Sequence, residues 1–315
     1  GSYMLDIAEV SLICPRNDLE SAEILKLAHE QGLDVRQSAQ GWGGTLGREP
    51  STTFQDLRRV VVVVELADPV AEELLRRAGH EVIVIDNHNY PGLMKRRRES
   101  SLEQFCDLIG FPMNHRLWQV AVNDQDFIQG LHRMGLSYAD MESLRREERA
   151  ILGTTKLFAD ALAYASNHRR PFQGVTLEQE LDLLLVPEGF RSVMGEAAQW
   201  PTQEEYDNAL TRHEGLRLPN CLILYHEESN SSQLVQMEYF GEARLRPAFN
   251  DLIQDETLKD FTMWAGGGNH TCYWGAIPKH PGAQVDQLVD RVLSFTLVEG
   301  RPLRHFSTTF LFPFK

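Results

Sequence analysis

The chain has 315 residues, of which 42% are hydrophobic and 24% charged. This composition is typical of a folded globular protein and excludes a disordered one. Lysine and arginine together number 31 and aspartate and glutamate 45, so the formal net charge is −14. A negative field opposes long polyanions, so we expect small substrates or cations rather than long nucleic acid.

The four cysteines are scattered and form no Cys-x-x-Cys pair, which argues against a zinc knuckle. Free thiols are typical of a reducing compartment, so we expect a cytoplasmic protein. The longest aliphatic run, Val60 to Val64, is far shorter than the roughly 20 apolar residues of a membrane span. Residues 1–15 lack a signal-peptide pattern. We expect no membrane partner, and the oligomeric state stays open, a homodimer included.

The first 110 residues alternate between strand and helix patterns. Short apolar runs predict buried strands over residues 10–13, 60–64 and 81–85. Capping signals and glycines predict helices over residues 19–31, 69–78 and 101–109. Strands that are apolar throughout and joined by helices favour a parallel sheet covered on both faces.

The second half of the chain has a different pattern. Residues 120–200 are mostly helical in pattern, with a long helix expected over 138–167. Beyond them we expect strands over 221–225, 234–240, 261–265 and 308–312, and helices over 244–254 and 283–293. With a boundary at residues 199–202, the sequence predicts an α/β protein of two domains. A parallel-sheet domain with a helical connector covers 1–198, and a second, smaller mixed α/β domain covers 203–315.

Polar side chains follow each predicted strand of the first domain. Ligands of parallel α/β sheets bind at the carboxyl ends of the strands. Clustered carboxylates repel one another unless a cation neutralises them, so their convergence indicates a metal site. The segments that follow the strands are Cys14 to Ser21, Glu65 to Asp68 and Asp86 to Tyr90, and the polar stretch Asn123 to Asp126 lies further on.

Four of these positions have a simpler structural explanation. Asp18 precedes a helix and is equally suited to capping it, and Glu20 suits the first helical turn. Asp124 and His88 have such alternatives too. Glu65 is different, because a charge that closes a run of five valines has no helix to cap.

The Asp86-Asn87-His88 segment resembles the signature of the DHH phosphoesterase superfamily, in which Asp-His-His follows an apolar strand. That resemblance implies a parallel-sheet DHH-type domain in which Cys14, Asp18 and Glu20 occupy the first motif, Glu65 the second and Asp124 the fourth. It also implies a C-terminal domain in which a glycine motif and a histidine receive phosphate. Gly266, Gly267, Gly268 and His270 resemble that motif, with one residue inserted.

The departures from the family pattern are at four ligand positions. Cysteine replaces histidine at 14, glutamate replaces aspartate at 20 and 65, and asparagine replaces histidine at 87. Each added methylene lengthens reach by about 1.5 Å, which is large beside the roughly 3.5–4 Å spacing of two catalytic ions. Arg16, inside the first motif, offers a guanidinium that could replace one metal charge or contact the substrate.

Two hypotheses about function follow. The first is a metal-dependent phosphoesterase that uses Mn²⁺ or Mg²⁺ on a small phosphate ester, nucleotide or short oligonucleotide. The metal would be held by Cys14, Asp18, Glu20, Glu65, Asp86, Asn87 and Asp124, with Asp86 and His88 as catalytic residues. Arg16, His88, the three glycines and His270 would bind the phosphate. The second is a catalytically decayed DHH-like protein that binds a nucleotide or a protein partner.

The two remaining motifs carry less functional information. Lys95 to Arg98 form the densest basic run, which is either a solvated segment or a phosphate contact. Gly41 to Gly47 lack the Gly-Lys-Ser/Thr ending of a phosphate-binding loop, so we expect a flexible surface loop there.

Overall fold

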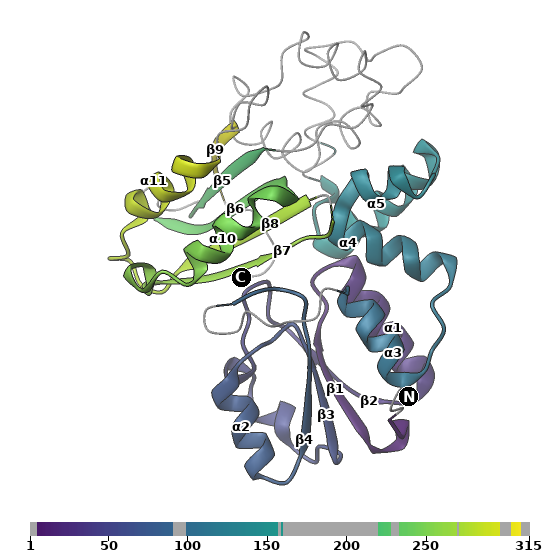
Figure 1. Cartoon of the computed structure of the whole chain (residues 1–315). Coiled ribbons are helices and arrows are strands. Elements are labelled where there is room, and N and C mark those ends of the chain that lie inside the picture. The colour runs from purple at the N-terminus through teal and green to yellow at the C-terminus, as the bar shows by residue number, and fades with distance from the viewer. Residues whose placement is uncertain are drawn as a thin grey trace. The chain divides into compact units, whose positions relative to one another are not determined.

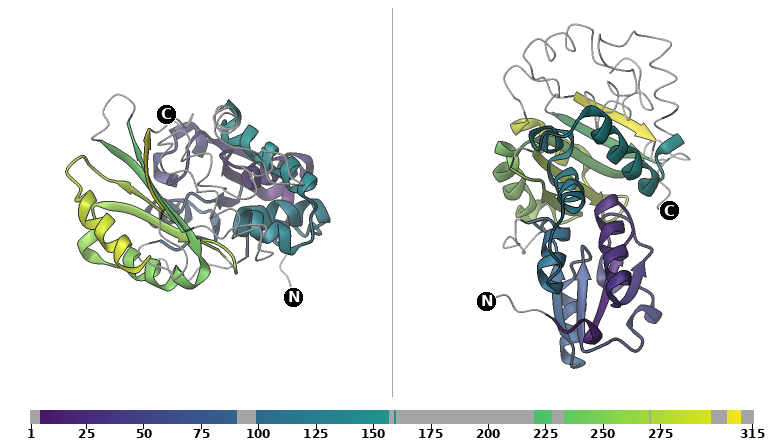
Figure 2. Two further views of the ribbon diagram at one scale, coloured as in Figure 1. Left: turned by 90° about the horizontal axis from the view of Figure 1, so that it is seen from above. Right: turned by 90° about the vertical axis from the view of Figure 1, so that its right-hand side faces the viewer.

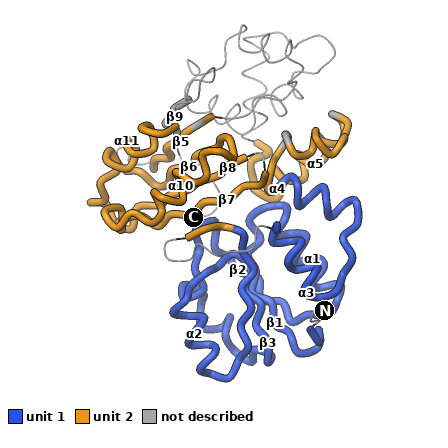
Figure 3. The backbone as a smooth tube through the Cα atoms, viewed as in Figure 1, with its two compact units in different colours: residues 1–87, 96–124, 314–315 blue, residues 88–95, 125–313 orange. Residues whose placement is uncertain are grey.

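The computed structural model describes residues 5–90, 99–156, 159, 220–227, 233–269, 271–296 and 304–309. The chain divides into two compact units (Figure 3): residues 1–87, 96–124 and 314–315 form the first, and residues 88–95 and 125–313 form the second. The α/β class with a parallel sheet and a second, mixed sheet is confirmed. The boundary expected at 199–202 lies outside the described residues, as does the basic run 95–98.

The first unit is built on a four-stranded parallel sheet of order β2-β1-β3-β4 (Figure 1). Its strands are β1 (Val10–Pro15), β2 (Asp34–Ser38), β3 (Val60–Val64) and β4 (Glu81–Ile85). Its helices are α1 (Leu19–Gln31), α2 (Pro69–Arg77) and α3 (Ser101–Ile109), with short 3₁₀ turns at Ile7–Glu9, Leu46–Arg48 and Ser51–Phe54. The predicted strands at 60–64 and 81–85 and the helix at 19–31 have the observed bounds.

Helices cover both faces of this sheet, as its apolar strands require. On one face Val61 and Val63 pack with Leu75 of α2. On the other lie α1 and α3 (Figure 1), which bury Ile24 and Phe105 completely. All five valines of β3 are fully buried. Close packing on both faces therefore keeps β3 rigid up to its carboxyl end.

Caps begin and end the helices where the sequence signals them. Asp68 caps α2 with Pro69 in the first turn, and Ser100 and Glu103 form the predicted capping box of α3. Gly32 and Gly110 end α1 and α3 in the left-handed conformation, with φ of 82° and 68°.

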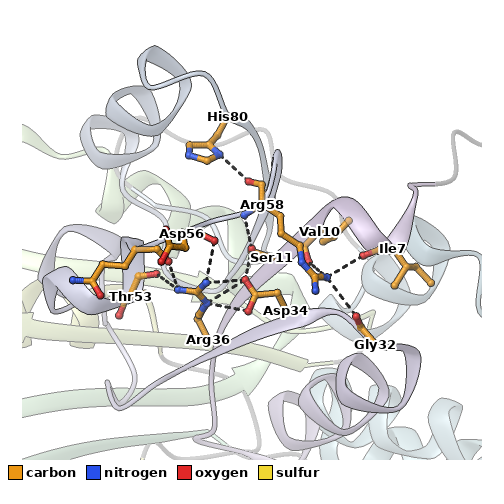
Figure 4. Close-up of polar contacts among 11 residues, drawn as sticks. Ile7, Val10, Ser11, Gly32, Asp34, Arg36, Thr53, Asp56, Arg58 and His80 are labelled. Carbon is orange, nitrogen blue, oxygen red and sulfur yellow. Dashed lines mark hydrogen bonds and ion pairs between the residues drawn. The ribbon is translucent and has the colours of Figure 1, made fainter.

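Strand β2 was not predicted, because only Val35 among its five residues is apolar. This edge strand is held by polar contacts instead (Figure 4). Arg36 donates through Nη2 to Asp34 at 2.9 Å and through Nη1 to the Gln55 carbonyl at 2.6 Å. Ser11 of β1 donates its hydroxyl to Asp34 at 2.6 Å. Asp34 therefore links the edge strand to β1 through Ser11. Its partner Arg36 links the same strand to the loop that follows it.

Removing the charge of Asp34 should lower stability in a pH-dependent way. Partial burial raises the pKa of this carboxyl, but bonds from Arg36 and Ser11 outweigh burial and lower it overall. A lowered folded-state pKa gives stability that is present above the unfolded value of about 3.9 and is lost as pH falls. Asp34→Asn should melt below wild type at about pH 7 and converge with it at about pH 3. Thermal melts of Glu30→Gln, an exposed carboxylate of α1, are the control; parallel curves for Asp34→Asn would contradict the account.

The second unit contains a five-stranded sheet of order β7-β8-β6-β5-β9. Its strands are β5 (Cys221–His226), β6 (Leu234–Glu242), β7 (Phe261–Gly266), β8 (Thr271–Pro278) and β9 (Arg304–Thr309). Every pairing is antiparallel except that of β5 with β9. Helices α10 (Arg246–Ile253) and α11 (Val285–Phe295) pack on one face (Figure 2), where Phe249, Leu252 and Val292 join the core. Turns of 3₁₀ helix lie at Ala243–Leu245 and Glu256–Leu258.

Among the described residues, helices α4 and α5 follow α3, and α4 begins in the first unit and ends in the second. Helix α4 (His115–Arg133) is interrupted at Phe127, whose φ of 51° and ψ of −142° are not helical. Helix α5 (Tyr138–Leu152) ends at Gly153 with φ of 74°, so the expected helix over 138–167 was wrong in its length. No helix in the described part of the chain combines the length and apolarity needed to cross a membrane.

Strand β8 is central in the sheet and was missed by sequence analysis. The glycine at its middle, Gly275, weakens the strand pattern. The structure explains that glycine: a Cβ at Gly275 would lie 2.3 Å from the Trp264 ring on β7. The absent side chain makes room for an indole that is only 4% exposed.

Gly275→Ala should therefore destabilise the second unit by about 1–3 kcal/mol, the usual cost of overpacking a core. Urea unfolding followed by tryptophan fluorescence measures this directly. Gly282→Ala is the matched control, because its Cβ would stay 3.3 Å from the nearest atom, on the His280 side chain. Equal stability of Gly275→Ala and wild type would show that the ring moves aside freely.

Candidate metal centre

The strands of the first unit end at one edge of the sheet because they are parallel. Cys14 lies near the end of β1, and Glu65 and Asp86 directly follow β3 and β4. The register pairs Val64 with Ile85, so Glu65 and Asp86 follow a matched pair of residues. The topology thus brings these three candidates to one edge.

Glu65 has a strained backbone. Its φ of 54° lies in the left-handed region, which costs a residue other than glycine about 1–3 kcal/mol. Its N–H donates to the Ile85 carbonyl at 2.9 Å, which fixes the peptide. The hydroxyl of Ser101, at the start of α3, donates to Glu65 Oε1 at 2.9 Å. The surroundings therefore hold the carboxylate in one direction despite the strain.

Asp86 and His88 belong to one short segment, so the chain itself keeps them near each other. Asp86 is 1% exposed. One ligand atom from each of Glu65, Asp86 and His88 lies within 4.8 Å of the others. Two carboxylate oxygens and an imidazole nitrogen at this spacing suit a divalent cation such as Mn²⁺.

Glu20 is a buried carboxylate of which one oxygen is satisfied: the Leu102 backbone forms a hydrogen bond to it that lowers its pKa. It lies in the first turn of α1, is 2% exposed, and its Oε2 has no hydrogen-bond partner among the described residues. Burial raises its pKa strongly, and the charges of Asp124, Glu65 and Asp18 raise it further. Four predicted ligands are therefore close enough to repel one another.

Cys14 belongs to the same cluster. The thiol is fully buried, and burial followed by the charges of Glu65, Asp18 and Glu20 raises its pKa well above the ordinary value. The S–H group donates a hydrogen bond to the Pro15 carbonyl, with 3.2 Å between the sulfur and the oxygen. The charged side chains that raise the pKa values of Cys14 and Glu20 are all acidic.

Asp18 acts as a helix cap and Arg16 points to solvent. Asp18 Oδ1 accepts the Ser21 N–H at 2.7 Å and, with the Ser21 hydroxyl, forms a capping box. The capping explanation of Asp18 therefore holds for one of its oxygens. Arg16 is exposed, and its guanidinium does not act on Cys14 or Glu20, so nothing supports it as a replacement for a metal charge.

Asn87 offers a second orphaned oxygen. Its Oδ1 is buried and has no hydrogen-bond partner within the described ranges. An amide oxygen left unpaired in a protein interior costs about 1–3 kcal/mol. Asn87 therefore offers a neutral oxygen donor next to Asp86 in the chain.

The glycine segment lies against His88. A Cβ at Gly266 would come 2.8 Å from His88 Cδ2, so only glycine lets the imidazole take this place. Gly267 has φ of 110°, and a Cβ there would meet the Thr271 carbonyl at 2.3 Å. A Cβ at Gly268 would come 2.4 Å from Asp126 Oδ2. His270 lies outside the described residues.

The loop expected to be flexible is held at several points. Gln40 and Thr45 bond each other twice, at 2.9 and 3.1 Å. Leu46 is fully buried and donates its N–H to the Leu66 carbonyl at 3.0 Å. Gly47 N–H donates to Asp68 Oδ2 at 2.8 Å. The expectation of a loose loop was therefore wrong, because a buried leucine and the cap of α2 anchor it.

Sequence analysis gave no functional role to two polar residues beside the predicted ones. Ser101 orients Glu65, but in the sequence it is indistinguishable from any serine of a capping box. Asp126 lies two residues after Asp124 and accepts bonds from Thr271. Only the fold shows that these two residues have such partners.

Comparison of the chain with protein-family models and with curated protein sequences found no match. Function must therefore be argued from the site itself.

Replacing Glu20 by glutamine should stabilise the protein in the absence of metal. Because the folded-state pKa of Glu20 is raised, its contribution is most favourable below the unfolded value of about 4.3 and worsens as pH rises. In EDTA, Glu20→Gln should melt above wild type at about pH 7.5, and the difference should shrink toward about pH 4. Glu30→Gln on the same helix is the control. A lower melting temperature for Glu20→Gln at both pH values would mean that the carboxylate is already well paired.

Proposed function

We propose that the chain is a metal-dependent phosphoesterase that acts on a small phosphate ester, a nucleotide or a short oligonucleotide. The observation that carries the proposal is the buried Glu20 carboxylate, whose Oε2 has no hydrogen-bond partner among the described residues and which is repelled by Asp124, Glu65 and Asp18. Unpaired buried charge is costly, and a divalent cation among these oxygens would offset that cost.

The donor set fits such a cation. Carboxylates with an amide oxygen and an imidazole are ligands that Mn²⁺ accepts, and carboxylates alone suit Mg²⁺. Glu20 Oε2 and Asn87 Oδ1 are both buried oxygens for which the described residues supply no donor. We assign metal binding to Cys14, Asp18, Glu20, Glu65, Asp86, Asn87 and Asp124. When bound, the cation would supply positive charge and Lewis acidity to a phosphate group.

The remaining roles belong to the protein's own groups. Asp86 and His88 follow β4 together, where the imidazole can hold a phosphate oxygen or shield developing charge. The glycines at 266–268 carry no side chains, and a turn of this composition allows backbone N–H groups to approach an anion. Ser101 keeps the Glu65 carboxylate oriented. The resemblance of Asp86-Asn87-His88 and of the glycine segment to the DHH pattern supports the same assignment.

One observation favours the second hypothesis, a decayed DHH-like protein that binds a nucleotide or a protein partner. Burial and the acidic neighbours of Cys14 raise the pKa of its thiol, which favours the protonated form, whereas a metal ligand must be a thiolate. The two hypotheses differ in whether Mn²⁺ binds and whether hydrolysis follows.

Restoring the family ligands tests the proposal. The quadruple variant Cys14→His, Glu20→Asp, Glu65→Asp, Asn87→His should bind Mn²⁺ at least about tenfold more tightly than wild type, because imidazole is a better ligand for this ion than an amide or a thiol. Titration calorimetry of EDTA-treated protein measures binding, and hydrolysis of bis(p-nitrophenyl) phosphate measures activity.

Glu30→Asp serves as the control, since it shortens an exposed carboxylate on α1 outside the cluster. The proposal predicts measurable Mn²⁺ binding and Mn²⁺-dependent hydrolysis by wild type. Binding without hydrolysis in both proteins would favour the decayed member. Absence of Mn²⁺ and Mg²⁺ binding in both would remove the metal site altogether.

A further inference from the structure

The turn after β7 already holds a carboxylate. A Cβ built at Gly268 would lie 2.4 Å from Asp126 Oδ2 and 2.5 Å from its Oδ1 and Cγ. The whole carboxyl group of Asp126 therefore fills the place that a side chain at Gly268 would take. This residue belongs to α4, far from the turn in sequence, and both lie in the second unit.

Asp126 also takes the hydrogen-bond donors at the end of the turn. Its Oδ1 accepts the Thr271 N–H at 3.2 Å and lies 3.1 Å from the Thr271 hydroxyl. That hydroxyl is also 2.8 Å from the Gln125 carbonyl. Thr271 is 1% exposed, so these bonds form where water competes little. A carboxylate accepting a backbone N–H beside glycines is bound as a ligand phosphate would be.

The carbonyl side of the turn is fixed by a cation. Arg246 Nη2 donates to the Gly268 carbonyl and, at 2.6 Å, to the Thr271 carbonyl. Its Nε is buried and has no hydrogen-bond partner within the described part of the chain. The guanidinium therefore lends positive charge to the turn, which favours an anion there.

The fold holds Asp126 in place. The next residue, Phe127, breaks the helical path of α4 with φ of 51° and ψ of −142°. Its ring packs edge-on against Phe240 of β6, with centroids 5.7 Å apart. Because an aromatic contact anchors the kink, the carboxylate beside it is presented to the turn by a fixed backbone.

We propose that Asp126 is a specificity-determining residue, an internal anion that excludes free inorganic phosphate from the glycine turn. A ligand must displace this carboxylate, which costs free energy. Only a ligand with further contacts, such as a nucleotide, can offset that cost. The proposal deepens the proposed function, because it rests on the glycine turn receiving the phosphate of that substrate.

The test is phosphate binding by Asp126→Asn and Asp126→Ala, measured by calorimetry in EDTA. The first variant keeps the shape and loses the charge, and the second loses both. Each should bind inorganic phosphate at least about tenfold more tightly than wild type, since one charge-assisted contact becomes available to the ligand. Asp290→Asn, an exposed carboxylate of α11, should leave phosphate affinity unchanged. Thermal melts establish that each variant is folded.

A second substitution tests whether the gain in phosphate affinity arises at the glycine turn. Adding Gly268→Ala to Asp126→Ala places a methyl group where the carboxylate was and should abolish the gain. Unchanged or weaker phosphate affinity in both Asp126 variants would overturn the proposal and make Asp126 a structural brace. Lack of phosphate binding by every variant would overturn it as well. Since these titrations need no metal, failure of Mn²⁺ binding would refute the proposed function separately.

Discussion

A buried carboxylate that other acids repel is the constraint on which the first unit depends. Glu20 is buried at the start of α1, and the charges of Asp124, Glu65 and Asp18 all raise its pKa. A protein interior tolerates such a group only as a neutral acid or beside a cation. The same conflict raises the pKa of Cys14, so one electrostatic feature links the ends of β1 and β3 to α1 and α4.

Contacts in the first unit hold the acidic residues close together despite their mutual repulsion. Glu65 holds an unfavourable backbone conformation, and the Ser101 hydroxyl and the Ile85 carbonyl both bond to it. Valines packed from both sides make the end of β3 rigid. Strain and buried charge maintained together are typical of functional sites, because a purely structural role would have been served by apolar residues.

The sequence predicts the first unit well for identifiable reasons. Runs such as Val60–Val64 and caps such as Asp68-Pro69 are local signals, and the structure follows them. Strand β2 could not be predicted because its stability comes from Arg36 and Asp34, whose partners are remote in sequence. Strand β8 was hidden by Gly275, a glycine that only the Trp264 ring explains. The candidate ligands could be chosen by their place after strands, but Ser101 and Asp126 could not, since their roles arise from tertiary contacts.

Anomalous diffraction at the manganese edge, from crystals grown with Mn²⁺ after EDTA treatment, tests the central claim most directly. The account predicts an anomalous peak bonded to Glu20, with Glu65 or Asp124 as a further ligand. A refined site without such a peak, in which Glu20 Oε2 accepts a hydrogen bond from a protein donor or from water, would contradict it.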